Sequence, residues 1–208
     1  MSQKLKTGLS GFWMLFLILF ALFMCGYTYK YMMVGDGVYP FVPQTKTYAA
    51  HHAWVVTHVG FGTLALITGI IQFVGQIRRR FVALHRISGR IYVSAVLIST
   101  IASIGVAPFA AGGLSNSVAF FIGAGLWSFS TLKGVQAIRC GDISAHKTWM
   151  IRSFALTLAA MSLRIELLIL VLLPGVSFSE AYLIVPWTCF FLNLVIAEWF
   201  VIGGKSKL

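Results

Sequence analysis

The stretch RRRFVALHRISGR at residues 78–90 is echoed by RCGDISAHKTWMIR at residues 139–152. In both stretches an Arg precedes a His by seven positions, and a second cation follows that His directly. Another Arg comes five or six positions after the His, and each stretch leads into an apolar run. The two histidines, His85 and His146, are 61 residues apart. We therefore expect two related helical hairpins, repeated in parallel along the chain.

Outward from these stretches the chain is mostly apolar. Of its 208 residues 59% are hydrophobic and 10% are charged, whereas a soluble domain carries about 25% charged residues. The apolar residues come in runs long enough to cross a bilayer, which takes about 20 residues of helix. Lipid cannot satisfy open backbone groups, so such runs must be helical. We predict an all-α polytopic membrane protein in which residues 1–208 form a single transmembrane domain.

Six transmembrane helices can be drawn between the Gly and Pro residues that interrupt the apolar runs. The N-terminal run is too long for the core of a signal peptide, so we count it as the first span. The two echoed hairpins are spans two and three and spans four and five, and together they make a four-helix core. The expected spans cover residues 9–33, 48–77, 86–108, 116–138, 147–173 and 179–203.

The positive charge of the chain is gathered on one side of the expected membrane. The net charge is +11, which in a soluble protein would indicate nucleic acid. Here the cations lie in the chain ends and in two short connections, where they are typical of lipid contact and not of nucleic-acid binding. The positive-inside rule makes this side cytoplasmic and places both termini in the cytoplasm.

The echoed histidines form the first candidate site. His85 and His146 begin helices that run in the same direction, so we expect them at the same depth, with Glu198 returning to their level. Paired imidazoles on facing helices of a bundle are typical ligands of haem iron, and haem propionates need cationic partners. We therefore predict haem b with these two histidines as axial ligands. The cations expected to hold the propionates or an anionic partner are Arg86, Arg90, Lys147 and Arg152.

A simpler interpretation of the same residues is open. A His beside a cation at the start of a membrane helix is ordinary interface chemistry, because it contacts lipid phosphate. Both His85 and His146 lie before the apolar run begins, which favours this interpretation. The recurrence of the pair favours the haem, since ionisable residues buried in a membrane are functional by default.

A second candidate set lies toward the other side of the membrane. His58 is about 15 Å into the second span, and Arg164 and Glu166 lie at a similar depth in the fifth. A mid-membrane Arg needs a partner or water. We expect Arg164 to meet another helix, a ligand carboxylate or a propionate, with a buried polar clamp as the alternative. Asn193 is expected to bond a neighbouring helix.

One face of the second span carries small and polar residues at helical spacing. Small residues let helices pack closely or let a flat cofactor lie against the backbone, and close packing is the favoured interpretation. The residues on this face are His58, Gly62, Ala65, Gly69, Gln72 and Gln76.

The echoed stretches resemble an uncharacterised bacterial family of six-helix membrane proteins that carries a domain of unknown function. The resemblance covers residues 50–200 and lies in LHRISGRIY (84–92) and HKTWMIRS (146–153), with Leu163-Arg164 and a late Asn193 and Glu198. It implies a multi-pass protein of the bacterial inner (cytoplasmic) membrane.

At a greater distance the layout is similar to cytochrome b561 and to the haem-b ferric-reductase-like membrane proteins. Those six-helix proteins ligate haem with paired His from spans two and four and from spans three and five. His85 and His146 match the second pair. His58 lies in span two, but span four contains no His. The resemblance therefore implies one haem, one haem with a further ligand on the outer side, or none.

These features predict a haem-b membrane electron-transfer protein that exchanges electrons with quinone or with a partner redox subunit. An oxidoreductase linked to quinone or to a metal would be one form of this activity, and paired His ligands leave no open position for oxygen. Two alternatives stay open. In the first, the bundle is an accessory or assembly subunit of a respiratory complex. In the second, it is a small transporter that uses His58, Arg164 and Glu166. The sequence shows no pair of interrupted helices of the kind that transporters use.

Overall fold

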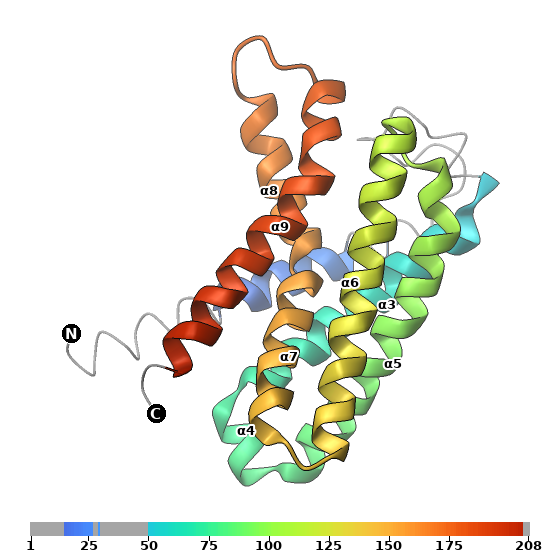
Figure 1. The fold of residues 1–208 in the computed structure, drawn as a ribbon. Helices are drawn as coiled ribbons and strands as arrows, with labels where there is room; N and C mark the ends of the chain where they lie inside the picture. Colours follow the sequence, from blue (N-terminus) through green and yellow to red (C-terminus); the bar gives the residue numbers. More distant parts are fainter. Residues whose placement is uncertain (1–14, 27–28, 30–49, 206–208) are drawn as a thin grey trace.

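The computed structural model describes residues 15–26, 29 and 50–205, and within them the chain is helical apart from short connections (Figure 1). This part of the chain contains no strand. A helix at Leu15–Gly26 is followed by α3 (His52–Phe73), α4 (Gly75–Arg80), α5 (Val82–Val106), the 3-10 turn η1 (Ala107–Phe109), α6 (Gly113–Arg139), α7 (Ile143–Thr157), α8 (Ala159–Val171) and α9 (Phe178–Lys205).

The apolar helices have the lengths that a bilayer requires. In the described residues α3, α5 with η1, α6 and α9 are each long and apolar enough to cross a membrane, and α7 with α8 is a fifth candidate if the bent pair is counted as one span. Expected spans two to six are therefore confirmed as helices of an all-α, polytopic membrane protein. Only Leu15–Gly26 of the first expected span, 9–33, is described, and the rest of that span lies outside the described residues.

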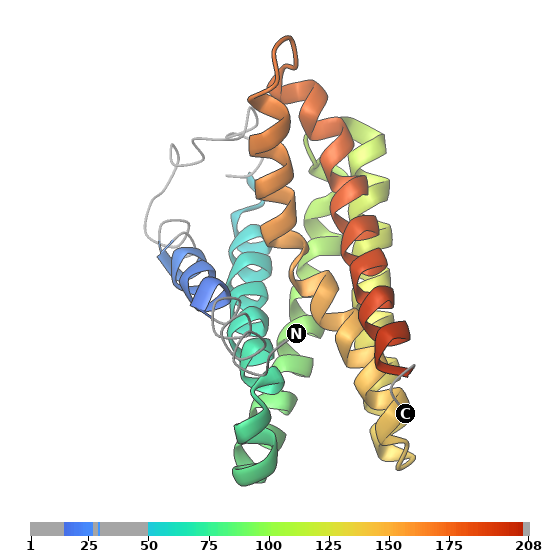
Figure 2. The same ribbon diagram turned by 90° about the vertical axis from the view of Figure 1, so that its left-hand side faces the viewer.

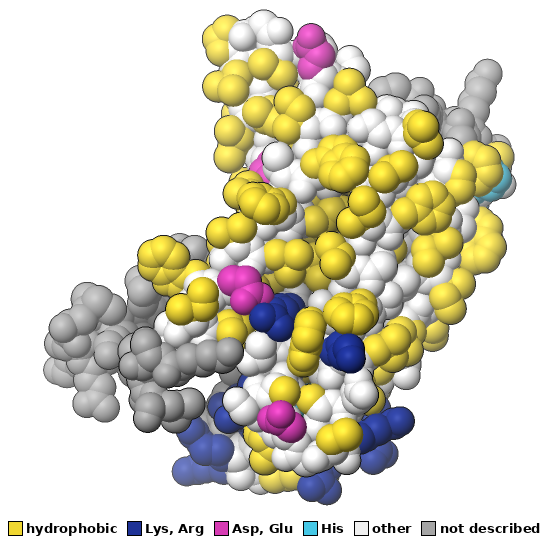
Figure 3. Space-filling model, in the orientation of Figure 1, with side chains coloured by type: hydrophobic (Ala, Val, Ile, Leu, Met, Phe, Trp, Pro, Cys, Tyr) yellow, Lys and Arg dark blue, Asp and Glu magenta, His cyan; other side chains and the backbone are white. Residues whose placement is uncertain are grey.

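The two echoed stretches lie at the same end of the bundle. Figure 1 shows that the α4 segment and the α6–α7 turn close their hairpins at the bottom of the view, while the α8–α9 turn lies at the top. Lysine and arginine side chains gather at that bottom end (Figure 3), which we call the basic end. It includes Arg78, Arg79, Arg80, Arg86, Arg139 and Lys147, all of them exposed.

Small residues let the helices of the core approach closely. A Cβ built on Gly69 of α3 would lie 2.6 Å from the ring of Phe154 and 3.0 Å from the ring of Tyr92. Ala65 is fully buried, and a Cβ on Gly62 would lie 3.5 Å from the Ser99 hydroxyl. The small-residue face of the second span is therefore packed against neighbouring side chains, as small faces in membranes commonly are.

The fifth span is broken, although a continuous helix over 147–173 was expected. α7 and α8 meet at Leu158 with a bend of 42°, and no Gly or Pro marks the place. From α9 the Asn193 side-chain amide donates to the Ala155 carbonyl at 3.0 Å and to the Ser162 hydroxyl at 2.8 Å. A side chain inserted into the backbone ladder is a recognised cause of such a kink. The expectation that Asn193 bonds a neighbouring helix is confirmed.

Candidate functional site

The second echo ends one helix and starts the next within four residues. Gly141 takes a φ of 79°, a conformation that favours glycine, and its N–H donates to the Ile138 carbonyl as α6 ends. The Asp142 carboxylate then accepts from the Ala145 N–H at 2.8 Å and caps α7. This stop and start places His146 in the first turn of α7, beside the last turns of α6.

His146 is oriented by a backbone carbonyl. Its Nδ1 lies 2.8 Å from the Gly134 oxygen. A carbonyl only accepts, so Nδ1 carries the proton and Nε2 presents its lone pair. Histidines that bind metal are commonly oriented in this way, by a bond from the other ring nitrogen. A Cβ built on Gly134 would lie 2.6 Å from the Met150 sulfur, so the glycine lets α6 and α7 approach each other closely.

His85 occupies the equivalent place in the first turn of α5. Its Nδ1 is buried and has no hydrogen-bond partner, which is unusual for a buried nitrogen. Its carbonyl accepts from the Gln72 amide at 3.2 Å, and the same amide donates to the Ser88 hydroxyl at 2.6 Å. Gln72 therefore ties the end of α3 to the start of α5. The His85 ring lies within electrostatic range of His146.

A buried cluster of hydroxyl groups joins α5 to α7 further inside the bundle. The Tyr92 hydroxyl lies 2.7 Å from the Ser153 hydroxyl and 2.8 Å from that of Thr157. On α6, Thr131 bonds Ser153 at 2.7 Å and the Trp127 indole N–H donates to Thr157 at 3.0 Å. All five side chains are buried. Sequence reasoning missed this cluster, because single hydroxyl residues scattered in apolar helices carry no pattern of their own.

The hydroxyl cluster shows that equivalent positions of the two echoes face each other. Tyr92 follows His85 by seven residues, and Ser153 follows His146 by the same number. Seven residues are about two helical turns, so each pair lies on one face of its helix. Because Tyr92 and Ser153 are bonded, the faces of α5 and α7 that carry the histidines are turned toward one another.

The predicted propionate cations are not equivalent in the structure. Arg86, Arg90 and Lys147 are exposed near the basic end. Arg152 is engaged by α9, because its Nε and Nη2 donate to the two carboxylate oxygens of Glu198 at 2.5 and 3.1 Å. Its guanidinium also stacks on Trp149, 4.5 Å from the ring centroid. As expected, Glu198 lies at the level of the second echo, where its carboxylate pairs with Arg152.

The donor set fits a haem coordinated by two histidines at the basic end. His146, with Nδ1 held by Gly134, would offer Nε2 to a haem iron, and His85, whose Nδ1 has no partner in the described residues, would supply the second imidazole. Further from the basic end Tyr92 bridges α5 to α7 directly. The described residues contain no group of three or more His, Cys, Asp and Glu arranged for a metal ion.

The outer candidate residues form two separate clamps. His58 Nδ1 lies 3.1 Å from the Ser99 carbonyl and 3.0 Å from its hydroxyl, which donates in turn to the His58 carbonyl at 2.9 Å. The Glu166 carboxylate accepts from the Thr188 hydroxyl of α9. Arg164 donates to the Ala160 carbonyl of its own helix at 2.5 Å and lies within electrostatic range of His58. These contacts match the polar-clamp interpretation for His58 and Glu166.

Comparison with known proteins gives the chain a family. The model of DUF2306, described as a predicted membrane protein, matches residues 55–201, which is more than half of the chain. Neither the curated proteins nor the solved structures contain a match, so the similarity to cytochrome b561 stays an expectation. The match begins in α3, leaves out the Leu15–Gly26 helix, and includes both echoes and the hydroxyl cluster. The chain belongs to the DUF2306 family of membrane proteins.

Proposed function

We propose that this protein is a haem-b electron-transfer protein of the bacterial cytoplasmic membrane, with His85 and His146 as the axial ligands. The observation that carries the proposal is the bond between Tyr92 and Ser153. It joins equivalent positions of the two echoes, two turns beyond the histidines, and so supports our inference that the two histidines lie on faces of α5 and α7 that are turned toward one another. A histidine that only contacts lipid phosphate would not need a second histidine on a facing helix.

The surroundings of the two imidazoles support the same assignment. The Gly134 carbonyl holds the His146 ring with Nε2 free, and the Gln72 bonds fix the backbone from which His85 projects. Arg86, Arg90 and Lys147 would bind the propionates, whereas Arg152 would fasten α9 to α7 through Glu198. Bound haem b supplies one-electron transfer, and two His ligands leave no open position for oxygen.

The proposed partners follow from the location of this site. Because the positive-inside rule makes the basic end cytoplasmic, the haem would exchange electrons near that surface, with quinone or with a partner redox subunit. The expected route does not cross the membrane, since α6 carries no His to form a second site with His58.

The test is the visible spectrum of the purified protein, oxidised and reduced with dithionite. We expect a sharp haem-b band in the reduced protein. His85→Ala and His146→Ala should each abolish this band. His58→Ala is the matched control, because it removes an imidazole bonded within the α3–α5 clamp, and it should leave the band intact. A colourless protein from cells supplied with haem would refute the proposal, and loss of the band in the His58 variant alone would move the site to the other half of the bundle.

The broken fifth span favours a second candidate function, that of a small transporter. Interrupted helices place backbone groups and helix ends inside the membrane, where transporters bind their substrates. The break at Leu158 lies between the hydroxyl cluster and Arg164 on α8. Proteoliposomes that contain a pH-sensitive dye would test this function. Proton-coupled uptake that Arg164→Gln abolishes and His85→Ala leaves unchanged would support a transporter over an electron carrier.

A further inference from the structure

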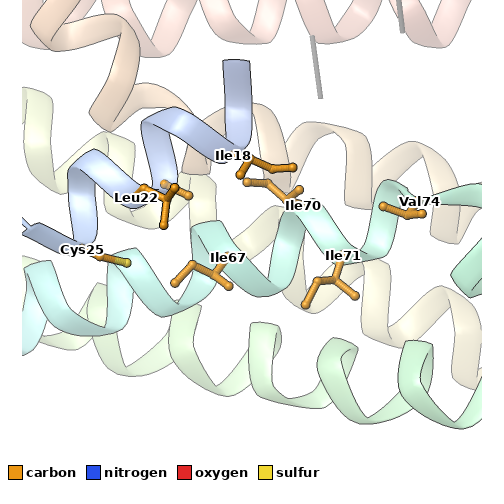
Figure 4. A pocket seen from close by; sticks show the side chains of 8 residues that line it. Ile18, Leu22, Cys25, Ile67, Ile70, Ile71 and Val74 are labelled. Atoms are coloured by element: carbon orange, nitrogen blue, oxygen red, sulfur yellow. The ribbon is translucent and has the colours of Figure 1, made fainter. Parts of the chain in front are cut away.

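An apolar pocket of about 350 Å³ lies between the Leu15–Gly26 helix and α3. Figure 4 shows the side chains that line it in a row along the two helices, with Cys25 and Ile67 toward one end and Val74 toward the other. Figure 2 shows the short helix alongside α3 on the flank of the bundle. The lining residues are Ile18, Ala21, Leu22, Cys25, Ile67, Ile70, Ile71 and Val74. They offer no charged side chain, so an occupant must be apolar along this length.

The Val74 end of the pocket leads directly to the arginine triplet. Val74 separates α3 from α4, and α4 carries Arg78, Arg79 and Arg80 in its last turn. The Arg79 guanidinium folds back over the start of α4, where its Nη2 would lie 3.7 Å from a Cβ built on Gly75. The Arg79 guanidinium therefore lies beside Gly75, the residue that directly follows Val74 in the chain.

The acidic side chains near the basic end in the described residues are engaged elsewhere. Asp142 caps α7, and Glu198 holds Arg152. Glu166 and Glu180 belong to the half of the bundle near the α8–α9 turn, where they bond Thr188 and Ser177. Within the part of the chain that the structure describes, the arginine triplet forms no ion pair. No described carboxylate therefore competes with an external anion for the triplet.

We propose that this pocket and the arginine triplet form a binding site for one anionic phospholipid. An acyl chain would lie in the pocket, and the headgroup phosphate would accept hydrogen bonds from the guanidinium groups. Arginine suits this role because its planar fork matches phosphate oxygens. Clusters of basic residues beside a membrane helix are known to select anionic lipids. The pocket lies on the side of α3 that faces the Leu15–Gly26 helix and shares no residue with the proposed haem site, so the inference is independent of the haem.

The experiment is native mass spectrometry of the purified full-length protein with phosphatidylglycerol and with phosphatidylcholine of the same acyl chains. We expect one molecule of phosphatidylglycerol to be retained in preference. Arg79→Gln should weaken its binding about fivefold, since each Arg near an anionic surface contributes about that factor. The matched control is Arg139→Gln, which removes an exposed cation from the last turn of α6 and should leave retention unchanged.

A second pair of variants tests the pocket itself. Ile71→Trp fills the pocket beside Val74 and should lower retention of both lipids, whereas Ile98→Trp, at an exposed position of α5, should lower neither. Equal retention of the two lipids by the unaltered protein would overturn the headgroup assignment. Loss of binding in the Arg79 variant without any effect of Ile71→Trp would place the lipid elsewhere on the basic end and overturn the pocket assignment.

Discussion

At the scale of single residues, the side chains that join the helices are mostly uncharged. Tyr92, Ser153 and Thr157 exchange hydrogen bonds inside the bundle, where a missing partner would cost more than in water because no solvent can replace it. The Arg152–Glu198 pair is only half-buried, so both charges keep access to polar surroundings. Among the described residues, the buried side-chain atoms without a hydrogen-bond partner are Nδ1 of His85, Oγ1 of Thr100 and Oδ1 of Asn116.

Removal of one hydroxyl tests how strongly the cluster holds α5 to α7. Tyr92→Phe keeps the buried ring and deletes the two bonds to Ser153 and Thr157. Interhelical hydrogen bonds in membrane proteins contribute about 0.6–2 kcal/mol, so we expect a loss of about 1 kcal/mol in the free energy of unfolding. Titration with SDS, followed by helical circular dichroism, measures it.

The control for this substitution is Ser128→Ala. Among the described residues the Ser128 hydroxyl bonds only the carbonyls of Ala124 and Gly125 in its own helix, so its removal should change the free energy of unfolding by less than about 0.5 kcal/mol. Equal stability of the Tyr92→Phe variant and the unaltered protein would mean that the hydroxyl cluster does not hold the two helices together.

At the scale of helices, shape decides which faces meet. α3 has a small face that receives aromatic rings from two other helices, Tyr92 from α5 and Phe154 from α7. Gly105 of α5 receives the Trp54 ring in the same way, and a Cβ there would lie 2.6 Å from it. In lipid there is little hydrophobic gain from helix association, so such fitting of rings into small faces supplies much of the packing energy.

A pair of glycine substitutions tests this packing. Gly69→Ala places a methyl group 2.6 Å from the Phe154 ring and 3.0 Å from Tyr92, and overpacking of this kind costs about 1–3 kcal/mol. At Gly125 of α6 an added Cβ meets nothing within 4 Å, so Gly125→Ala should be neutral or should stabilise by up to about 1 kcal/mol through helix propensity. Thermal unfolding in detergent compares the two. A Gly69→Ala variant as stable as the Gly125→Ala variant would show that this contact is loose.

At the scale of the whole molecule, the charge distribution is the basis for the orientation that we propose. Figure 3 shows Lys and Arg side chains gathered at the basic end, while Glu180 lies in the first turn of α9, next to the α8–α9 turn at the opposite end (Figure 1). Juxtamembrane Lys and Arg are retained on the cytoplasmic side during insertion. The orientation of this end therefore decides which side of the membrane the paired histidines and the arginine triplet face.

Reporter fusions test the orientation. A fluorescent protein fused after Leu208 should fluoresce, because we place the C-terminus in the cytoplasm, and alkaline phosphatase at the same place should be inactive. The reverse pattern is expected for both reporters inserted in the α8–α9 turn at Gly175. Active phosphatase at the C-terminus would contradict the proposed orientation and would move the haem site to the other side of the membrane.

Much of the fold was open to prediction from the sequence. The composition and the apolar runs determine a polytopic helical membrane protein, because lipid leaves the backbone no alternative to helix. Spans two to six agree with α3 to α9 in order and approximate bounds. The echo with His85 and His146 also placed its two stretches at one end, since connections between successive spans alternate between the two surfaces of the membrane.

Only the tertiary structure decided which side chains meet. It joined Tyr92 to Ser153, committed Arg152 to Glu198, and broke the fifth span at Leu158 with a side chain from α9. None of these contacts follows from the local sequence, because each depends on the rotation and depth of two helices that packing sets together. Hydrophobicity determines that a segment crosses the membrane, whereas the fit of individual side chains determines what it touches there.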